Sequence, residues 1–232
     1  MDTQNTARER IVRAAAALLE EGGREAVSTR AVSAAAKVQP PAIYRLFGDM
    51  QGLLDAVTSH GIAEYLRTKT QREHAADPVE DLRRGWDLHV EFGLAHPALY
   101  TLLYGNPRPG VEPPAAREAG EILAGLVHRV AEAGRLRVGV DEAARMIHSA
   151  GCGVTLTLIA AGPGHRDPHL SPRSREAVLA AVTTGGAIVA EAPSPVPHAV
   201  ALKAALPAME ALTPAEKVLL GEWLDRLTRP AG

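Results

Sequence analysis

The chain has 232 residues, 46% of them hydrophobic and 22% charged, and its formal net charge at pH 7 is −2. This length fits one large domain or two small ones, and the composition is ordinary for a globular protein with a sizeable core. The weak net charge excludes a general polycation that coats nucleic acid. The single cysteine, Cys152, excludes an intrachain disulfide and favours a reducing compartment.

The N-terminal segment, MDTQNTARER, is polar and lacks the apolar core of a signal peptide. Apolar stretches elsewhere are interrupted by Gly, Thr or charge before they reach the roughly 18 residues of a membrane span. We therefore expect a cytoplasmic protein with no membrane partner. Aromatic residues make up only 3% of a chain rich in Ala, Leu, Arg and Glu, which favours an all-α fold.

The first 72 residues show apolar positions at helical spacing, separated by strong start and stop signals. Gly22-Gly23 ends the first helix, Ser28 is a good N-cap for the second, and Asp49 is one for the fourth. The predicted helices cover residues 6–21, 29–36, 40–47 and 50–72. A short helix, a tight turn and another short helix match the helix-turn-helix design, whose last helix enters the DNA major groove.

The adjacent prolines Pro40-Pro41 stand where the third helix is expected to begin. The first N–H groups of a helix have no intrahelical partner, so proline loses no hydrogen bond there, and its fixed φ suits the helix. The pair is therefore predicted to start a helix rather than to break one. It also removes two donors, so contacts to DNA there would be apolar, for instance with a thymine methyl group.

After about residue 77 the predicted helices become longer. They cover 78–95, a short segment from Pro97, 114–134, 142–161 and 173–191, with two weaker helices near 198–211 and 214–228. We expect a DNA-binding domain over 1–50 and a larger helical domain over 51–232, with a Pro-rich break near 193–197.

Residues 10–58 resemble the tetracycline-repressor (TetR) family of bacterial transcription regulators. RIVRAAAALLEEGG is similar to the family's first helix, and VSTRAVSAAAKVQPPAIYRLFGDMQGLLDAV to its helix-turn-helix and the start of its fourth helix. AHPALYTLLYG, residues 95–105, resembles a stretch of the family's ligand domain. The sequence departs from the family pattern at Lys37, where Gly is usual, and at Gln39, Leu46 and Met50, where a small residue, an aromatic or His, and Lys are usual.

The resemblance implies a ligand-responsive regulator, a repressor in particular, whose partner is a double-stranded DNA operator. The residues that it places at DNA are Ser28, Thr29, Arg30, Lys37, Gln39, Pro40, Pro41, Ala42, Tyr44 and Arg45. Tyr44 can donate to a phosphate, and Arg45 can hold a phosphate or read guanine. The alternatives are core packing for Tyr44, a solvated side chain for Arg45 and a salt bridge within the domain for Arg30. Met50 removes one phosphate contact expected in the family.

Half of the scarce aromatic residues fall within a short stretch after residue 85, together with two histidines. By the resemblance they line a pocket for a small apolar or amphipathic effector, a mostly apolar site with a few polar groups. The candidate ligand-binding residues are Trp86, His89, Phe92, Tyr100, Tyr104, Met146, Cys152 and Thr155. For any one of them, plain packing in the core is the alternative.

The helices at 142–161 and 173–191 carry small residues in series, which permit close helix approach: Ala150, Gly151, Gly153, Thr183, Thr184, Gly185 and Gly186. In the family the corresponding helices form a two-fold dimer interface, so we expect a homodimer. Two-fold symmetry would let paired recognition helices meet half-sites about 34–36 Å apart. Tight packing within one subunit is the alternative.

Metal binding and catalysis are both disfavoured by the sequence. His165 and His169 are four residues apart, but prolines around them indicate a loop, and no further ligands complete a site. His148, Ser149 and Cys152 suggest a nucleophile only superficially, because neighbours in a helix are not expected to face one another. We expect no cofactor and no enzyme activity. The competing hypothesis is an all-helical enzyme or ligand-storage protein whose N-terminal segment is only structural.

Overall fold

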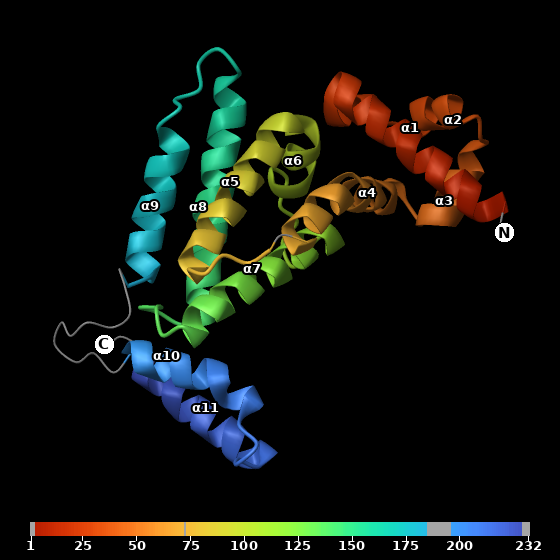
Figure 1. Cartoon of the computed structure of the whole chain (residues 1–232). Coiled ribbons are helices and arrows are strands. Elements are labelled where there is room, and N and C mark those ends of the chain that lie inside the picture. The colour runs from red at the N-terminus through yellow and green to blue at the C-terminus, as the bar shows by residue number, and fades with distance from the viewer. Residues whose placement is uncertain (1–2, 72, 185–195, 229–232) are drawn as a thin grey trace. The chain divides into compact units, whose positions relative to one another are not determined.

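The computed structural model describes residues 3–71, 73–184 and 196–228, and in these ranges the expected all-α fold is confirmed (Figure 1). The α-helices are α1 (Thr3–Ala26), α2 (Thr29–Ala36), α3 (Pro40–Phe47), α4 (Met50–Gln71), α5 (Pro78–Ala95), α6 (Pro97–Tyr104), α7 (Pro114–Glu132), α8 (Val140–Ala161), α9 (Leu170–Val182), α10 (Val196–Ala205) and α11 (Pro214–Thr228). A short 3-10 helix, η1 (Leu206–Ala208), follows α10.

The chain forms two compact units, each with its own interior. The first unit comprises residues 1–72 and 91–119, and the second comprises residues 73–90 and 120–232. The first unit therefore contains α4 and α6 in addition to the predicted helix-turn-helix segment. Helices α5 and α7 each contribute residues to both units.

The first unit is built around the apolar stripe that the sequence predicts for its helices. Its fully buried side chains include Ile11, Leu19, Val32, Ile43, Leu53, Leu54 and Ile62. Helix α1 breaks at Gly23, which has a φ of 67°, so the predicted stop signal is present although a further turn continues to Ala26. Gly61 lets α4 approach α6 closely, because a Cβ there would lie 2.5 Å from a methyl carbon of Leu99.

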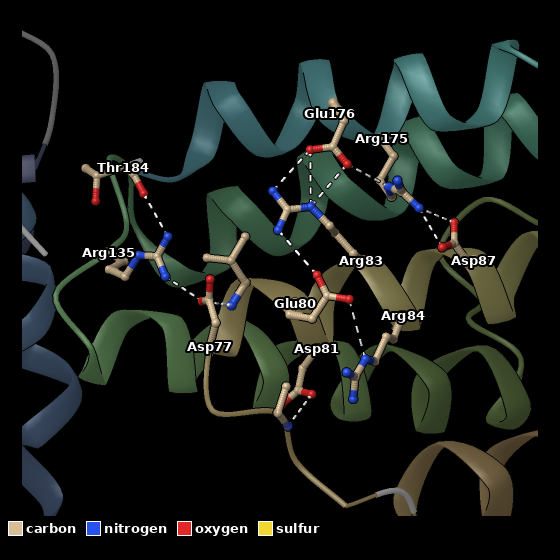
Figure 2. Close-up of polar contacts among 12 residues, drawn as sticks. Asp77, Glu80, Asp81, Arg83, Arg84, Asp87, Arg135, Arg175, Glu176 and Thr184 are labelled. Carbon is tan, nitrogen blue, oxygen red and sulfur yellow. Dashed lines mark hydrogen bonds and ion pairs between the residues drawn. The ribbon is translucent and has the colours of Figure 1, made fainter. Parts of the chain in front are cut away.

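Ion pairs connect α5 to α9 in the second unit (Figure 2). Arg83 Nε donates to Glu176 Oε1 at 3.1 Å, and Arg175 Nη1 donates to Asp87 at 2.5 Å. The hydrogen bond from Arg83 holds the pKa of Glu176 below its ordinary value. These carboxylates are about half exposed, so each pair contributes little to stability by itself.

The predicted helix over 173–191 is wrong at its C-terminal end. Helix α9 ends at Val182, and Thr183 is extended, with φ −122° and ψ 158°. The Thr183 hydroxyl donates to the Leu179 carbonyl at 2.7 Å, and the Thr184 amide donates to the Arg135 carbonyl at 2.9 Å. Two successive β-branched residues and this pairing with residue 135 end the helix. Residues 185–191 of that prediction, Gly185 and Gly186 among them, lie outside the described residues.

The two C-terminal helices pack on each other as a hairpin (Figure 1). Its interior consists of Ala199, Leu206 and Leu224, with Met209, Leu212 and Leu220 packed against them. The helix predicted over 198–211 is shorter than expected, because Pro207 lies in η1, which follows the end of α10 at Ala205. Most of the predicted Pro-rich break near 193–197 lies outside the described residues.

Helix α8 is, by length and composition alone, apolar enough to cross a membrane. A single helix of this kind is weak evidence for a membrane span, because core helices of other proteins meet the same criterion.

Candidate DNA-binding and ligand-binding sites

The turn between α2 and α3 is closed by backbone hydrogen bonds and by one side-chain cap. Ser28 is the N-cap of α2, and its Oγ accepts a hydrogen bond from the Ala31 amide at 3.2 Å. At the other end, the Lys37 and Val38 amides donate to the Ala34 and Ser33 carbonyls at 3.2 and 3.0 Å. This pairing of the last carbonyls is the usual way in which a helix ends before a tight turn.

Lys37 adopts a left-handed backbone conformation, with φ 52° and ψ 51°, and is the only non-glycine residue with positive φ among those described. A side chain in this conformation costs roughly 1–2 kcal/mol relative to the right-handed region. The structure therefore gives a physical reason why glycine is usual at this turn in the family. Lys37 retains the turn at some cost in stability and adds an exposed positive charge there.

Helix α3 begins at the two prolines, as predicted. Gln39 is its N-cap in an extended conformation, and the Gln39 carbonyl accepts a hydrogen bond from the Ala42 amide at 2.9 Å. Gly48 ends the helix with a φ of 80°, and its amide donates to the Tyr44 carbonyl. Eight residues of helix between two fixed ends give α3 a defined direction, which a recognition helix needs.

One face of α3 is anchored and the other is open. Ile43 is fully buried, and the Arg8 guanidinium lies 5.1 Å from the centre of the half-buried Phe47 ring. Tyr44 is 51% exposed and Arg45 is exposed as well. The Tyr44 hydroxyl lies 3.3 Å from the Thr29 Oγ1, so the open face of α3 and the start of α2 meet there. The sequence did not predict either the Arg8 contact or the hydroxyl pair, since both depend on the folding of distant residues.

All ten residues predicted at DNA belong to this first unit and are exposed or half-buried. Thr29 and Ala42 are half-buried, and the other eight (Ser28, Arg30, Lys37, Gln39, Pro40, Pro41, Tyr44 and Arg45) are exposed. The start of α4 follows directly, where Asp49 Oδ1 accepts from the Gly52 amide at 2.7 Å. The arrangement presents polar side chains and helix N-termini to solvent, where they can receive phosphate oxygens.

Three of the predicted ligand-binding residues gather around Gly151 of α8 in the second unit. A Cβ built on Gly151 would lie 3.6 Å from His89 Cδ2 and 3.7 Å from Trp86 Cζ3. Cys152 Sγ lies 4.0 Å from His89 Nε2 and 3.6 Å from His148 Nε2. His148 and Cys152 therefore do face each other, contrary to the expectation from sequence, because residues four apart share one face of a helix.

Trp86 and the two remaining predicted ligand residues of the second unit, Thr155 and Met146, differ in exposure. Trp86 is buried, and its Nε1 donates to Ser171 Oγ at 3.0 Å. Thr155 is fully buried, and its hydroxyl donates to the Gly151 carbonyl at 2.8 Å. Met146 is 38% exposed. A cavity of about 410 Å³ in this unit is lined by other residues, among them Asp141, Arg145 and Lys203.

The remaining predicted ligand residues, Phe92, Tyr100 and Tyr104, lie in the first unit. Phe92 stacks on Tyr65, with ring centroids 4.5 Å apart, and Tyr100 lies 4.9 Å from Tyr104. Tyr100 is fully buried. The aromatic cluster that is continuous in sequence is thus divided between the interiors of two units.

A buried ion pair that no sequence pattern indicated lies at the start of α5. Asp81 is 7% exposed and accepts hydrogen bonds from the Ala75 amide at 2.8 Å and from the Arg129 guanidinium. Burial alone raises the pKa of Asp81, but the hydrogen bonds from Ala75, Arg129 and His74 outweigh it and keep the pKa below its ordinary value. Nearby, Arg135 donates to Asp77 and to the Thr184 carbonyl (Figure 2).

Comparisons with known proteins agree with this geometry. Residues 11–57 match the model of bacterial regulatory proteins of the tetR family, and residues 82–183 match that of a tetracyclin repressor-like C-terminal domain. No curated protein sequence matches the chain.

Solved structures share the fold. A TetR-family regulator structure from Streptomyces coelicolor A3(2) is 25% identical, with a TM-score of 0.53, and the match covers 95% of this chain and 96% of that one. A TetR-family structure from Shewanella sp. PV-4 is 17% identical, with a TM-score of 0.61 over 77% of this chain and 98% of that one. A TetR variant from Acinetobacter baumannii AYE in complex with minocycline is 20% identical, with a TM-score of 0.56 over 78% and 93%.

An exposed recognition helix on a three-helix core, joined to a larger helical domain, defines a DNA-binding transcription regulator of the helix-turn-helix class. Since its N-terminal and C-terminal domain models together match more than half of the chain, the protein belongs to the TetR family. It is accordingly a ligand-responsive transcriptional regulator.

Proposed function

We propose that the protein is a homodimeric repressor that binds an operator through α3 and leaves it when a small apolar or amphipathic effector binds. The observation that carries this proposal is the open face of α3, where Tyr44 and Arg45 stand exposed beside the N-terminus of α2. We further propose that it acts in the cytoplasm and has no enzyme activity, in keeping with a family of regulators.

The DNA-facing side chains divide into two roles. Tyr44, Thr29 and the start of α2 suit phosphate oxygens, because a hydroxyl and free helix amides are neutral donors. Arg45 and Gln39 suit a base edge in the major groove, where Arg pairs with guanine and Gln with adenine. Pro40, Pro41 and Ala42 offer an apolar edge at the start of α3 that suits a thymine methyl group. Arg30 and Lys37 add exposed charge for nonspecific attraction.

The homodimer is supported by the exposed face of α8 and α9. Along α8, the exposed positions Ser149, Gly153 and Thr157 repeat every four residues, and Ala161 continues the series. On α9 the exposed residues Ala177, Ala180 and Ala181 are also small. A face of small, uncharged residues permits close approach of helices from a second copy, and two-fold symmetry then pairs two recognition helices on one operator.

The effector is proposed to bind near Gly151, where Trp86, His89 and Cys152 converge in the second unit. An indole, an imidazole and a thiol supply an apolar wall with a few polar atoms, the mixture that suits a drug-like or lipid-like molecule. Tetracyclines are a reasonable first class to test, because minocycline is bound in one of the similar structures.

The proposal is tested by DNA binding with the DNA upstream of the protein's own gene. Fluorescence anisotropy should give a specific complex that weakens steeply with salt, since each phosphate contact contributes a slope of about 0.9 in log K against log salt. The Tyr44→Phe, Arg45→Ala double variant serves as the control and should lose most of the affinity. If low salt yields no specific complex with any upstream fragment, the alternative of a helical ligand-storage protein is favoured.

Effector binding needs a separate test, because a regulator can bind DNA without the proposed ligand site. A thermal-shift screen that begins with minocycline and extends to amphipathic compounds should return ligands that raise the melting temperature and release DNA. His89→Ala should weaken the binding of such a ligand, whereas Tyr104→Phe, in the first unit, should not.

A further inference from the structure

Helix α11 has an apolar stripe that its own hairpin leaves uncovered. Leu219, Trp223 and Leu227 follow one another every four residues, and they are 46%, 50% and 52% exposed. Five of the eight large hydrophobic residues that are exposed among the described residues belong to the hairpin of α10 and α11. The hairpin lies outside both segments that match the family models.

The stripe lies on a different face of α11 from the one that contacts α10. The contact side carries Leu224, which is 5% exposed, Gly221, whose built Cβ lies 3.8 Å from Leu206, and Lys217, which donates to the Pro207 carbonyl at 3.0 Å. Lys203 and Asp225 close the hairpin with an ion pair of 2.5 Å. The contacts that hold α10 and α11 together therefore do not involve the stripe, which stays available to a binding partner.

We propose that the stripe pairs with the same stripe of a second copy, antiparallel about a two-fold axis at Trp223, so that the two hairpins clasp the homodimer. This inference rests on the proposed homodimer. Residues spaced by four form a ridge along a helix, and two such ridges interlock in the commonest class of helix packing. With Trp223 on the axis, Leu219 of each copy meets Leu227 of the other.

The charges beside the stripe favour a second copy over an unrelated partner. Glu222 and Arg226 are exposed, and each stands one position before a stripe residue, so both lie along the same edge of the stripe. A two-fold axis at Trp223 places this edge of one copy beside the same edge of the other, with the helices antiparallel. Glu222 of each copy then lies near Arg226 of the other. The interface would thus contain two symmetry-related pairs of opposite charge, which makes the two surfaces electrostatically complementary.

The area of the stripe is too small to hold a dimer by itself, so the stripe would add to another interface. Half of the Trp side chain amounts to roughly 100 Å² and half of each smaller Leu side chain to roughly 75 Å², so the stripe presents roughly 250 Å² per copy. That is close to the size at which apolar patches on monomers become functional, but well below the roughly 800 Å² per partner of a stable interface. The clasp therefore needs the dimer that α8 and α9 are proposed to form. The hairpin belongs to the same compact unit as α8 and α9, which keeps both hairpins close to that dimer at high effective concentration.

The test measures how fast fluorescently labelled full-length subunits exchange between dimers. Trp223→Glu should speed exchange about tenfold or more, because a central Trp commonly dominates an interface. Val218→Glu is the matched control, since Val218 is 66% exposed on α11 but lies off the stripe. It should change exchange less than twofold. The single reversals Glu222→Arg and Arg226→Glu should each speed exchange, and the double reversal should restore the original rate.

A second measurement leaves the stripe intact. The chain has two Trp residues, so Trp86→Phe leaves Trp223 as the only emitter, and pairing shifts its emission to shorter wavelength as subunits associate. Equal exchange rates for Trp223→Glu and Val218→Glu in a dimeric protein would overturn the clasp and leave the proposed homodimer standing. So would a double reversal that fails to restore the rate, or an emission shift that appears only with phosphatidylcholine vesicles. A wild-type chain that is monomeric throughout would refute the proposed homodimer itself, together with the clasp.

Discussion

Removing one hydroxyl group, in Tyr44→Phe, separates the DNA-binding role of α3 from its folding role. In the free protein the hydroxyl lies 3.3 Å from Thr29 Oγ1. That is longer than the usual 2.7–2.8 Å of a hydroxyl pair, and the side chain is 51% exposed. We therefore expect the free energy of unfolding to fall by at most about 0.5 kcal/mol.

The expected loss in DNA affinity is larger. A hydroxyl that donates to a charged phosphate is worth about 1.5 kcal/mol after exchange with water, and a dimer makes the contact twice. The sum of about 3 kcal/mol corresponds to a roughly 150-fold weaker complex. Because the hydroxyl is neutral, the dependence of affinity on salt should not change.

The assay is a salt titration of operator binding by fluorescence anisotropy, paired with urea denaturation of the same samples. Tyr104→Phe, which removes a hydroxyl from α6, is the control for general effects. A loss of affinity below twofold, or a loss of stability above about 1 kcal/mol, would refute the assignment of this hydroxyl to DNA. Arg45→Ala in the same assay distinguishes a phosphate contact, which lowers the salt slope by about 1 per copy, from a base contact, which relaxes sequence preference instead.

Two further predictions concern stability. Lys37→Gly should raise the free energy of unfolding by about 1 kcal/mol, because glycine adopts the left-handed conformation without a steric cost, whereas Lys37→Ala should give no such gain in urea denaturation. For Asp81, whose folded pKa is lowered, the stabilisation is complete above the ordinary carboxyl pKa and is lost as the pH falls through the folded value. Stability measured against pH should therefore drop from about pH 4 downward, and Asp81→Asn should flatten that drop. Arg129→Met should cost about 3 kcal/mol at pH 7 by leaving the Asp81 carboxylate without its cation, and a loss below 1 kcal/mol would contradict this account.

The N-terminal helices could be predicted from sequence because local signals specify them. Ser28 as a cap and Pro40 at a helix start act on their own neighbouring amides, so no distant contact is needed. The end of α9 shows the limit of the same reasoning. The apolar spacing continues past Val182, but the strand-like pairing of Thr183 and Thr184 with residues near Leu136 competes with the helix, and that pairing depends on the tertiary fold.

The candidate ligand site could be predicted only in part. Trp86 and His89 converge with Cys152, as their helical spacing suggested. This convergence depends on the contact of only two helices, α5 and α8. Phe92 and Tyr100 are in the same aromatic stretch, yet they pack in the interior of the other unit. Composition and spacing cannot show this division, since it follows from which helices cover each end of α5.

Helix α5 gives the division a functional consequence. Its residues up to Val90 belong to the unit with the proposed effector site, and those from Glu91 belong to the unit that contains α3. Trp86 and His89 belong to the same helix as Phe92, which stacks on Tyr65 of α4 within the first unit. We expect an effector that displaces α5 to act on α4 through that stack.

The two ends of α5 should then have separable effects on regulation. His89→Ala should weaken the binding of whichever compound the thermal-shift screen returns. Phe92→Leu should leave that binding within about threefold but reduce the release of DNA, because the helix still moves while its contact with Tyr65 is lost. Calorimetric titration of the compound, with and without bound operator, measures both quantities. If Phe92→Leu weakens the compound's binding to the free protein as strongly as His89→Ala does, then Phe92 acts in binding, and transmission through α5 is refuted.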